Sequence, residues 1–106
     1  MLPLRLVIDT NVLISAALKP SGLQRTVLLL AMNKPARWYV SRPILEEYRI
    51  VLARPELQIR KGLRQQLLQT IKNRSHFVAR TSHLEVTRDP DDNIFLECAD
   101  AAGATI

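Results

Sequence analysis

Short apolar runs alternate along the chain with longer runs of helical periodicity. Residues 4–8 are largely apolar and show no clean alternation, which is typical of a strand buried on both faces of a parallel sheet. Two further short apolar runs, at residues 38–40 and 77–79, are also predicted to be strands. Because predicted strands and helices alternate, the pattern favours an α/β fold with a central parallel sheet.

Helices are predicted between and after these strands, over residues 12–17, 22–33, 42–53, 57–73 and 90–102. Thr10 or Asn11 can cap the first helix, and Ser21 can cap the second. Ser41 precedes a proline suited to a first helical turn, so it is the expected start of the third. Gly62 is expected to interrupt the fourth helix and Gly103 to end the fifth.

The length and composition are those of one small globular domain. The chain has 106 residues, of which 47% are hydrophobic, too many for a disordered protein. Its single cysteine, Cys98, excludes an internal disulfide framework and a cysteine-based zinc site. No secretory signal is recognisable, and the longest uninterrupted apolar run is far too short to span a bilayer. We therefore expect a cytoplasmic protein.

The charge balance favours a polyanionic partner. Fifteen Lys and Arg against ten Asp and Glu give a formal net charge of +5, and nucleic acid is the commonest partner of such a protein. Aromatic residues make up only 5% of the chain, so a stacking platform for bases is poorly supported. The basic residues between 60 and 74 could line an RNA groove, although a solvated helix face is the commoner explanation.

Asp9 directly follows the first predicted strand. In open α/β sheets, ligands bind beyond the carboxyl ends of the strands, and Asp9 falls at that edge. The alternative is an ordinary acid at a helix N-terminus, which the helix dipole favours. Taken alone, Asp9 does not decide between these roles.

Glu47 is the second candidate acid. Projecting residues 42–53 as a helix places one broad apolar face over Ile44, Leu45, Tyr48, Val51 and Leu52. Glu47 lies at the edge of this face, whereas Glu46 points away from it. A carboxylate beside a buried face needs a reason, because burying an unpaired charge is costly.

Asp92 is the third candidate, in the stretch RDPDDN at the start of the last helix. It borders that helix's apolar stripe, and Asp89 and Asp91 lie close by. Capping explains one of these acids, but three like charges repel unless Arg88 or a divalent cation offsets them. Asp9, Glu47 and Asp92 could converge at one sheet edge, where an all-oxygen ligand set suits Mg²⁺ or Mn²⁺. A carboxylate-bound metal in a basic protein is suited to phosphodiester hydrolysis.

Three segments resemble the successive motifs of PIN-domain proteins, in the same order and spacing: VIDTNVLISA, SRPILEEYRIVLARPEL and RDPDDNIFLECADAAGA. The subgroup that they resemble most is the one assigned to toxin components of bacterial toxin–antitoxin systems. The resemblance implies a metal-dependent ribonuclease that uses Mg²⁺ or Mn²⁺, with RNA as its substrate and a cognate antitoxin protein as its partner. It also implies a possible homodimer.

The resemblance assigns the same three acids to catalysis and metal binding. Asp9 matches the first family acid and is followed by Thr10 and the customary Asn11. Glu47 matches the second because a bulky residue follows it, and Asp92 matches the third because an alanine stands seven positions later.

Two further residues have supporting places in the matched motifs. Ser41 matches a family preference at the end of the second strand, although a helix cap explains it equally well. Asp91 lies beside the third acid.

In the family the chain continues into a strand that ends in a Thr-Gly-Asp type motif with a further acid, whereas this sequence ends at Ile106. We therefore expect residues 1–106 to form a single PIN-like domain, a three-layer α/β/α fold that lacks its C-terminal strands. The alternative function is a degenerate PIN domain that binds RNA or a protein without cleaving. A receiver-like domain is a third reading, but the additional acidic pair and the lysine that it requires are not found.

Overall fold

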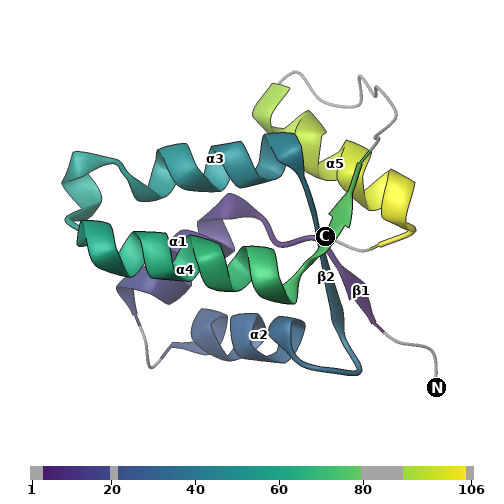
Figure 1. Cartoon of the computed structure of the whole chain (residues 1–106), viewed down its shortest axis with the longest axis horizontal. Coiled ribbons are helices and arrows are strands. Elements are labelled where there is room, and N and C mark those ends of the chain that lie inside the picture. Colours follow the sequence, from purple (N-terminus) through teal and green to yellow (C-terminus); the bar gives the residue numbers. More distant parts are fainter. Residues whose placement is uncertain (1–3, 20–21, 80–89, 105–106) are drawn as a thin grey trace.

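A computed structural model describes residues 4–19, 22–79 and 90–104, with only the backbone of residues 90–93. These residues form three strands, β1 (Arg5–Leu6), β2 (Arg37–Ser41) and β3 (His76–Val78). Five α-helices flank the strands (Figure 1), and they are α1 (Thr10–Leu18), α2 (Leu23–Met32), α3 (Arg42–Leu52), α4 (Lys61–Arg74) and α5 (Pro90–Ala102). A single 3₁₀ turn, η1 (Pro55–Leu57), lies between α3 and α4.

The strands form a parallel sheet in the order β1-β2-β3, which confirms the predicted α/β class. Leu6 pairs with Trp38 across β1 and β2, and Val40 pairs with Phe77 across β2 and β3. β1 is shorter than the predicted strand over residues 4–8. Val7 and Ile8 are buried, but they lie beyond the residues that pair with β2. The Ile8 carbonyl bonds to a side chain instead of to β2.

The helices follow the predicted pattern with three corrections. The N-cap of α1 is Asp9, so neither Thr10 nor Asn11, the expected caps, occupies that position. α2 begins at Leu23 with Gly22 in the N-cap position; Ser21, the expected cap, lies outside the described residues. Residues 57–60 do not belong to the fourth helix, and Gly62 does not interrupt it, since it stands in the first turn of α4. The start of a helix tolerates glycine better than its middle, where the full entropy cost applies. Within the described ranges, no helix is both long and apolar enough to cross a membrane.

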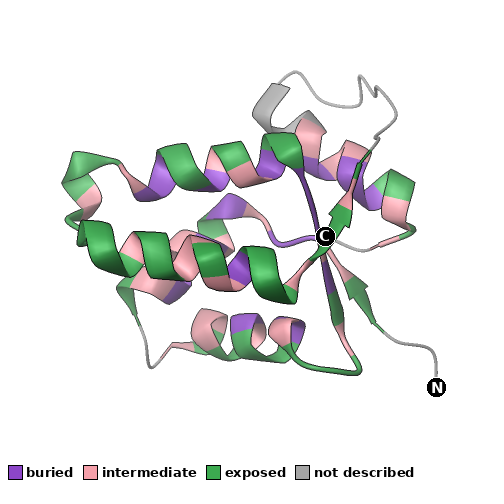
Figure 2. Cartoon of the chain, in the orientation of Figure 1, coloured by how far each residue is buried: buried purple, intermediate pink, exposed green. Residues whose placement is uncertain are grey.

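The core lies between the sheet and the helices, and all five α-helices contribute buried side chains to it. Its largest fully buried side chains are Trp38, Tyr48, Leu13, Leu28, Ile44, Leu52 and Ile71. The predicted apolar face of α3 is correct, because Ile44, Tyr48, Val51 and Leu52 are all buried. α4 is exposed over most of its length, with Ile71 as its buried residue (Figure 2).

The last carbonyl groups of α5 accept hydrogen bonds from the following backbone and from the Arg5 side chain of β1. Gly103 has a left-handed φ of 63°, and the N–H of Ala104 donates to the Ala99 carbonyl at 2.8 Å. The N–H of Gly103 donates to the backbone carbonyl of Asp100 at 3.3 Å, which completes a Schellman motif. Arg5 Nη1 donates to the Ala102 carbonyl at 3.2 Å, which places a positive charge at the negative end of the helix dipole.

Gly62, in α4, and Gly103, just after α5, should respond in opposite directions to substitution by alanine. Gly103→Ala should lower the free energy of unfolding by about 1 kcal/mol, because an L side chain disfavours the left-handed region. Gly62→Ala should raise it by up to about 0.5 kcal/mol, since a Cβ there meets only open space and alanine favours helix. Urea unfolding of both variants measures the two effects, and changes of the same sign would contradict this account.

Candidate metal centre

Asp9 stands between β1 and α1 with a carboxylate that does not cap the helix. It occupies the N-cap position in an extended conformation (φ −65°, ψ 147°), yet its side chain makes no capping hydrogen bond. Its carbonyl accepts the first helical N–H groups, from Val12 at 3.1 Å and Leu13 at 3.3 Å. Helix capping would be a purely structural reason for an acid at this position. The Asp9 side chain does not perform that role.

The two neighbouring glutamates of α3 differ as predicted. Glu46 is exposed and forms an ion pair with Arg49, which lowers the pKa of its carboxyl group. Glu47 is half-buried, at the border of the face that packs into the core. Of the two, Glu47 has the environment of a functional acid.

Tyr48 joins the element that carries Glu47 to the element that carries Asp9. Its hydroxyl donates to the backbone carbonyl of Ile8, the residue before Asp9, and its side chain is completely buried. Burial raises the pKa of Tyr48, and the negative charge of Asp9 acts in the same direction. The phenol therefore stays protonated and remains a donor at physiological pH.

Only the backbone of the third acid, Asp92, lies within the described part of the structure. Asp92 lies in the first turn of α5, three residues before Phe95, whose ring lies 6.3 Å from that of Tyr48 between centroids. Its side chain and that of Asp91 lie outside the described residues. Among the residues that are described, no three His, Cys, Asp or Glu side chains gather as a metal site.

The supporting residues have three different environments. Ser41 is buried and caps α3, with its Oγ accepting from the Ile44 N–H at 3.4 Å. Thr10 is 7% exposed, and its Oγ1 has no hydrogen-bond partner in the described part of the chain. Asn11 is exposed on α1. Ser41 thus has a structural role, whereas Thr10 places an unsatisfied buried hydroxyl beside Asp9.

The donor set fits a hard divalent cation. Asp9 and Glu47 would supply carboxylate oxygens, whereas Cys98 is a buried free thiol. Oxygen-only ligands suit Mg²⁺ and Mn²⁺ and do not suit zinc or copper.

Comparison with known proteins identifies the family. The PIN-domain family model matches residues 5–106. The chain belongs to the PIN-domain family. It is also similar to the uncharacterized protein MJ1680 of Methanocaldococcus jannaschii, with 31% identity over 97% of this chain and 68% of the relative. No solved structure matches it significantly. PIN domains are typically metal-dependent nucleases that bind divalent cations.

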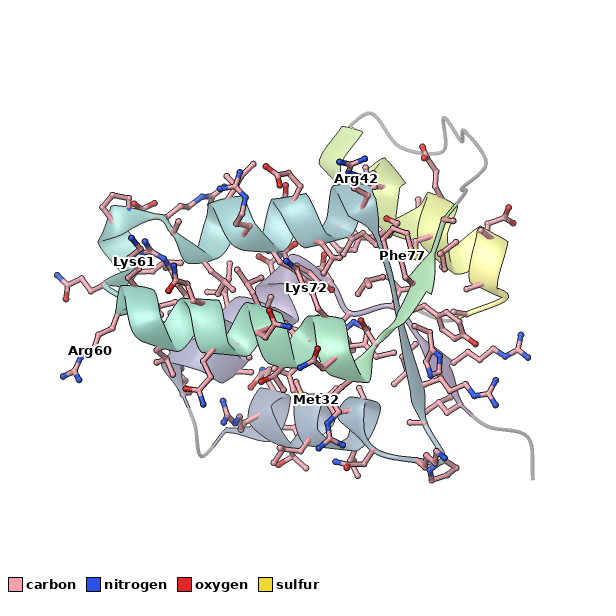
Figure 3. All side chains as sticks on the ribbon, viewed as in Figure 1. Met32, Arg42, Arg60, Lys61, Lys72 and Phe77 are labelled. Atoms are coloured by element: carbon pink, nitrogen blue, oxygen red, sulfur yellow. The ribbon has the colours of Figure 1, made fainter. Side chains whose placement is uncertain are left out.

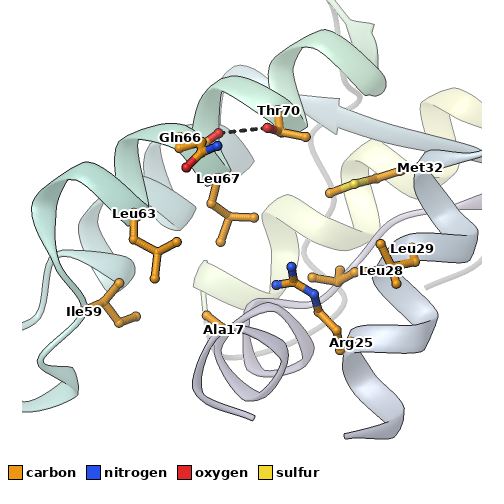
Figure 4. Close-up of a pocket in the computed structure, with 10 residues that line it drawn as sticks. All are labelled: Ala17, Arg25, Leu28, Leu29, Met32, Ile59, Leu63, Gln66, Leu67 and Thr70. Carbon is orange, nitrogen blue, oxygen red and sulfur yellow. Dashed lines mark hydrogen bonds between the residues drawn. The ribbon is translucent and has the colours of Figure 1, made fainter. Parts of the chain in front are cut away.

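A second feature of this PIN domain is a largely apolar groove whose lining includes no acid (Figure 4). The groove has a volume of about 260 Å³ and lies among α1, α2 and α4. Its lining consists of Ala17 of α1, four residues of α2, four of α4 and Ile59 from the segment before α4. The α2 residues are Arg25, Leu28, Leu29 and Met32, and the α4 residues are Leu63, Gln66, Leu67 and Thr70. Leu29 and Leu63 at its rim are about half exposed. The guanidinium of Arg25 points into the groove, and no described carboxylate pairs with it.

Sequence reasoning missed two of these features. The periodicity places Tyr48 on the apolar face of α3, directly after Glu47, but it gives the hydroxyl no partner, although a tyrosine on a buried face indicates that one exists. The groove carries no comparable local signal, since Arg25 and Leu63 lie on separate helices and meet only through the packing of α2 and α4.

The Cys98 thiol should be unreactive in the folded protein. Burial raises its pKa to about 11, against an ordinary value of 9.0, and a hydrogen bond with Ser41 acts in the opposite direction. At pH 8 only about one thiol in a thousand is then ionised. Alkylation by iodoacetamide, followed by mass spectrometry, should be slow in the native protein and should accelerate as the pH approaches 11. The denatured chain is the control, and equal rates in both states would contradict the prediction.

Proposed function

We propose that this PIN domain is a metal-dependent endoribonuclease that cleaves RNA phosphodiester bonds. The observation that carries the proposal is the packing of Tyr48 against the turn before Asp9. This contact brings the α3 helix, with half-buried Glu47, to the carboxyl end of β1, where an acid stands without a capping role. The arrangement supports the family's nuclease chemistry at this edge of the sheet.

Asp9, Glu47 and Asp92 are the residues that would hold the cation. A bound Mg²⁺ or Mn²⁺ supplies an activated water and stabilises charge on the phosphate oxygens. The chain's own contribution is to hold negatively charged oxygens in place on three separate elements. Because the carboxylates repel one another without a cation, they make a site that selects for positive charge.

RNA is the favoured substrate because of the family and the distribution of charge. α4 carries Lys61, Arg64, Lys72 and Arg74 and no acid in its 14 residues. Arg60, just before it, extends into solvent (Figure 3). These cations can attract and position a phosphate backbone, whose binding should weaken as salt rises.

We further propose that the enzyme is a toxin neutralised by an antitoxin, and that an acidic amphipathic helix of that partner occupies the groove between α2 and α4. The exposed leucines at the rim fit an apolar helix face, and Arg25, which pairs with no carboxylate of the described residues, fits an acid within that face. The net charge of +5 favours an acidic partner over a basic one.

The ribonuclease proposal is tested by incubating the full chain with mixed-sequence single-stranded RNA in Mn²⁺ and in EDTA. Asp9→Asn, Glu47→Gln and Asp92→Asn should each reduce cleavage to the level seen with EDTA, because each removes a charged oxygen ligand. Each variant should be as stable as the parent or slightly more stable, since removing one charge relieves repulsion.

Neighbouring acids provide the matched controls. Glu46→Gln and Asp100→Asn remove exposed carboxylates from the same two helices and should leave cleavage unchanged. Parental cleavage by the three site variants would refute the site. Absence of cleavage by the folded parent chain would favour a domain that binds RNA or protein without cutting.

The groove proposal is tested with two amphipathic helical peptides that differ only in one central residue, Glu or Lys, by fluorescence anisotropy. The Glu peptide should bind more tightly, and Arg25→Glu should reverse the preference. Leu29→Asp should weaken binding about tenfold or more, because it places a charge in the apolar contact. Leu30→Asp is the control, since Leu30 is exposed on α2 but does not line the groove. Equal binding of both peptides to the parent would count against the proposal.

A further inference from the structure

We propose that Tyr48 is a positioning residue whose hydroxyl holds Asp9 in place relative to Glu47, so that the two acids can share one cation. The inference rests on the proposed metal-dependent function and assigns a role to a side chain that does not itself bind metal. It follows from the contacts on either side of Asp9 and around the Tyr48 ring.

The backbone around Asp9 is held on both sides. The peptide before Asp9 is held through its carbonyl, that of Ile8, which accepts the Tyr48 hydroxyl. The carbonyl of Asp9 itself accepts from Val12 and Leu13 at the start of α1. The backbone from which the Asp9 carboxylate projects is therefore fixed by Tyr48 on one side and by α1 on the other.

The donor is itself immobilised. The Tyr48 ring lies edge-on to Trp38 of β2, with centroids 6.3 Å apart and planes at 65°. On α5 it contacts Phe95 at the same centroid distance. Packing against β2 and α5 therefore fixes the position of the hydroxyl. Through its hydrogen bond the hydroxyl fixes the Ile8 carbonyl, next to Asp9.

The hydroxyl is not needed to fill the core. Phenylalanine has the same ring and would satisfy the apolar face of α3 without placing a polar group in a fully buried position. A buried hydroxyl stabilises only when it is paired, and here its partner is the peptide next to a candidate metal ligand. Because Tyr48 directly follows Glu47 and Ile8 directly precedes Asp9, this bond between residues 40 positions apart links the neighbours of the two acids.

The test measures Mn²⁺ affinity of the full chain by electron paramagnetic resonance of the free and bound ion, with no RNA present. Tyr48→Phe should weaken Mn²⁺ binding about tenfold or more, the size of effect seen when groups that orient metal ligands are removed. It should also broaden the bound-ion spectrum as the coordination becomes less uniform. Replacing Tyr48 by 4-aminophenylalanine, which retains a donor at the same place, should restore most of the affinity.

Two variants separate positioning from general stability. Tyr39→Phe removes the other tyrosine hydroxyl, on a half-exposed ring that stacks near His76, and should leave Mn²⁺ affinity unchanged. Ile71→Val removes a methylene from the fully buried residue of α4 and destabilises the fold without touching the Asp9 turn. It should also leave the affinity unchanged at temperatures where the protein is folded.

The outcomes distinguish the two proposals. Parental Mn²⁺ affinity in Tyr48→Phe would overturn the positioning role and leave the proposed nuclease intact. An equal loss in Ile71→Val, or failure of Tyr48→Phe to fold, would assign the hydroxyl to general stability and would also overturn it. Absence of Mn²⁺ binding by the folded parent would overturn the metal-dependent function and the positioning role together.

Discussion

A buried phenol must find an acceptor, and in this domain the acceptor is the Ile8 carbonyl. That hydrogen bond joins α3 to the turn between β1 and α1, and the ring that carries it packs on β2 and α5. The elements that hold the three candidate acids therefore meet around one side chain. The ladder of β1 ends at Leu6, and two residues later the Ile8 carbonyl bonds to Tyr48.

The polar groups that cap the helices are different from the carboxylates to which we assign a function. Ser41 caps α3 and the Gly103 turn closes α5, so these termini are satisfied without a carboxylate. At α1 the acid stands in the cap position, but its side chain does not cap. The Asp9 carboxylate therefore stands at the carboxyl end of β1 without a capping role, in a chain whose overall charge is positive.

The helix α1 connects the two surfaces to which we assign functions. Asp9 precedes its first turn, and Ala17, in its last turn, lines the groove, about 12 Å further along the axis from the helical rise. The carboxylates suit a cation and a phosphate ester, whereas the groove suits an apolar helix with an acid. One short helix thus links a candidate reaction site to a candidate regulatory surface.

The sequence by itself determined the α/β class, the parallel sheet, the buried face of α3 and the greater burial of Glu47 than of Glu46. These follow from local periodicity and from the cost of burying charge, both of which are properties of a single segment. Only the tertiary structure decided that Tyr48 bonds to Ile8, that β1 stops at Leu6 and that Arg25 faces a groove formed with α4. Each of these depends on groups far apart in sequence, and no local pattern encodes which partner a buried donor will meet once the helices pack.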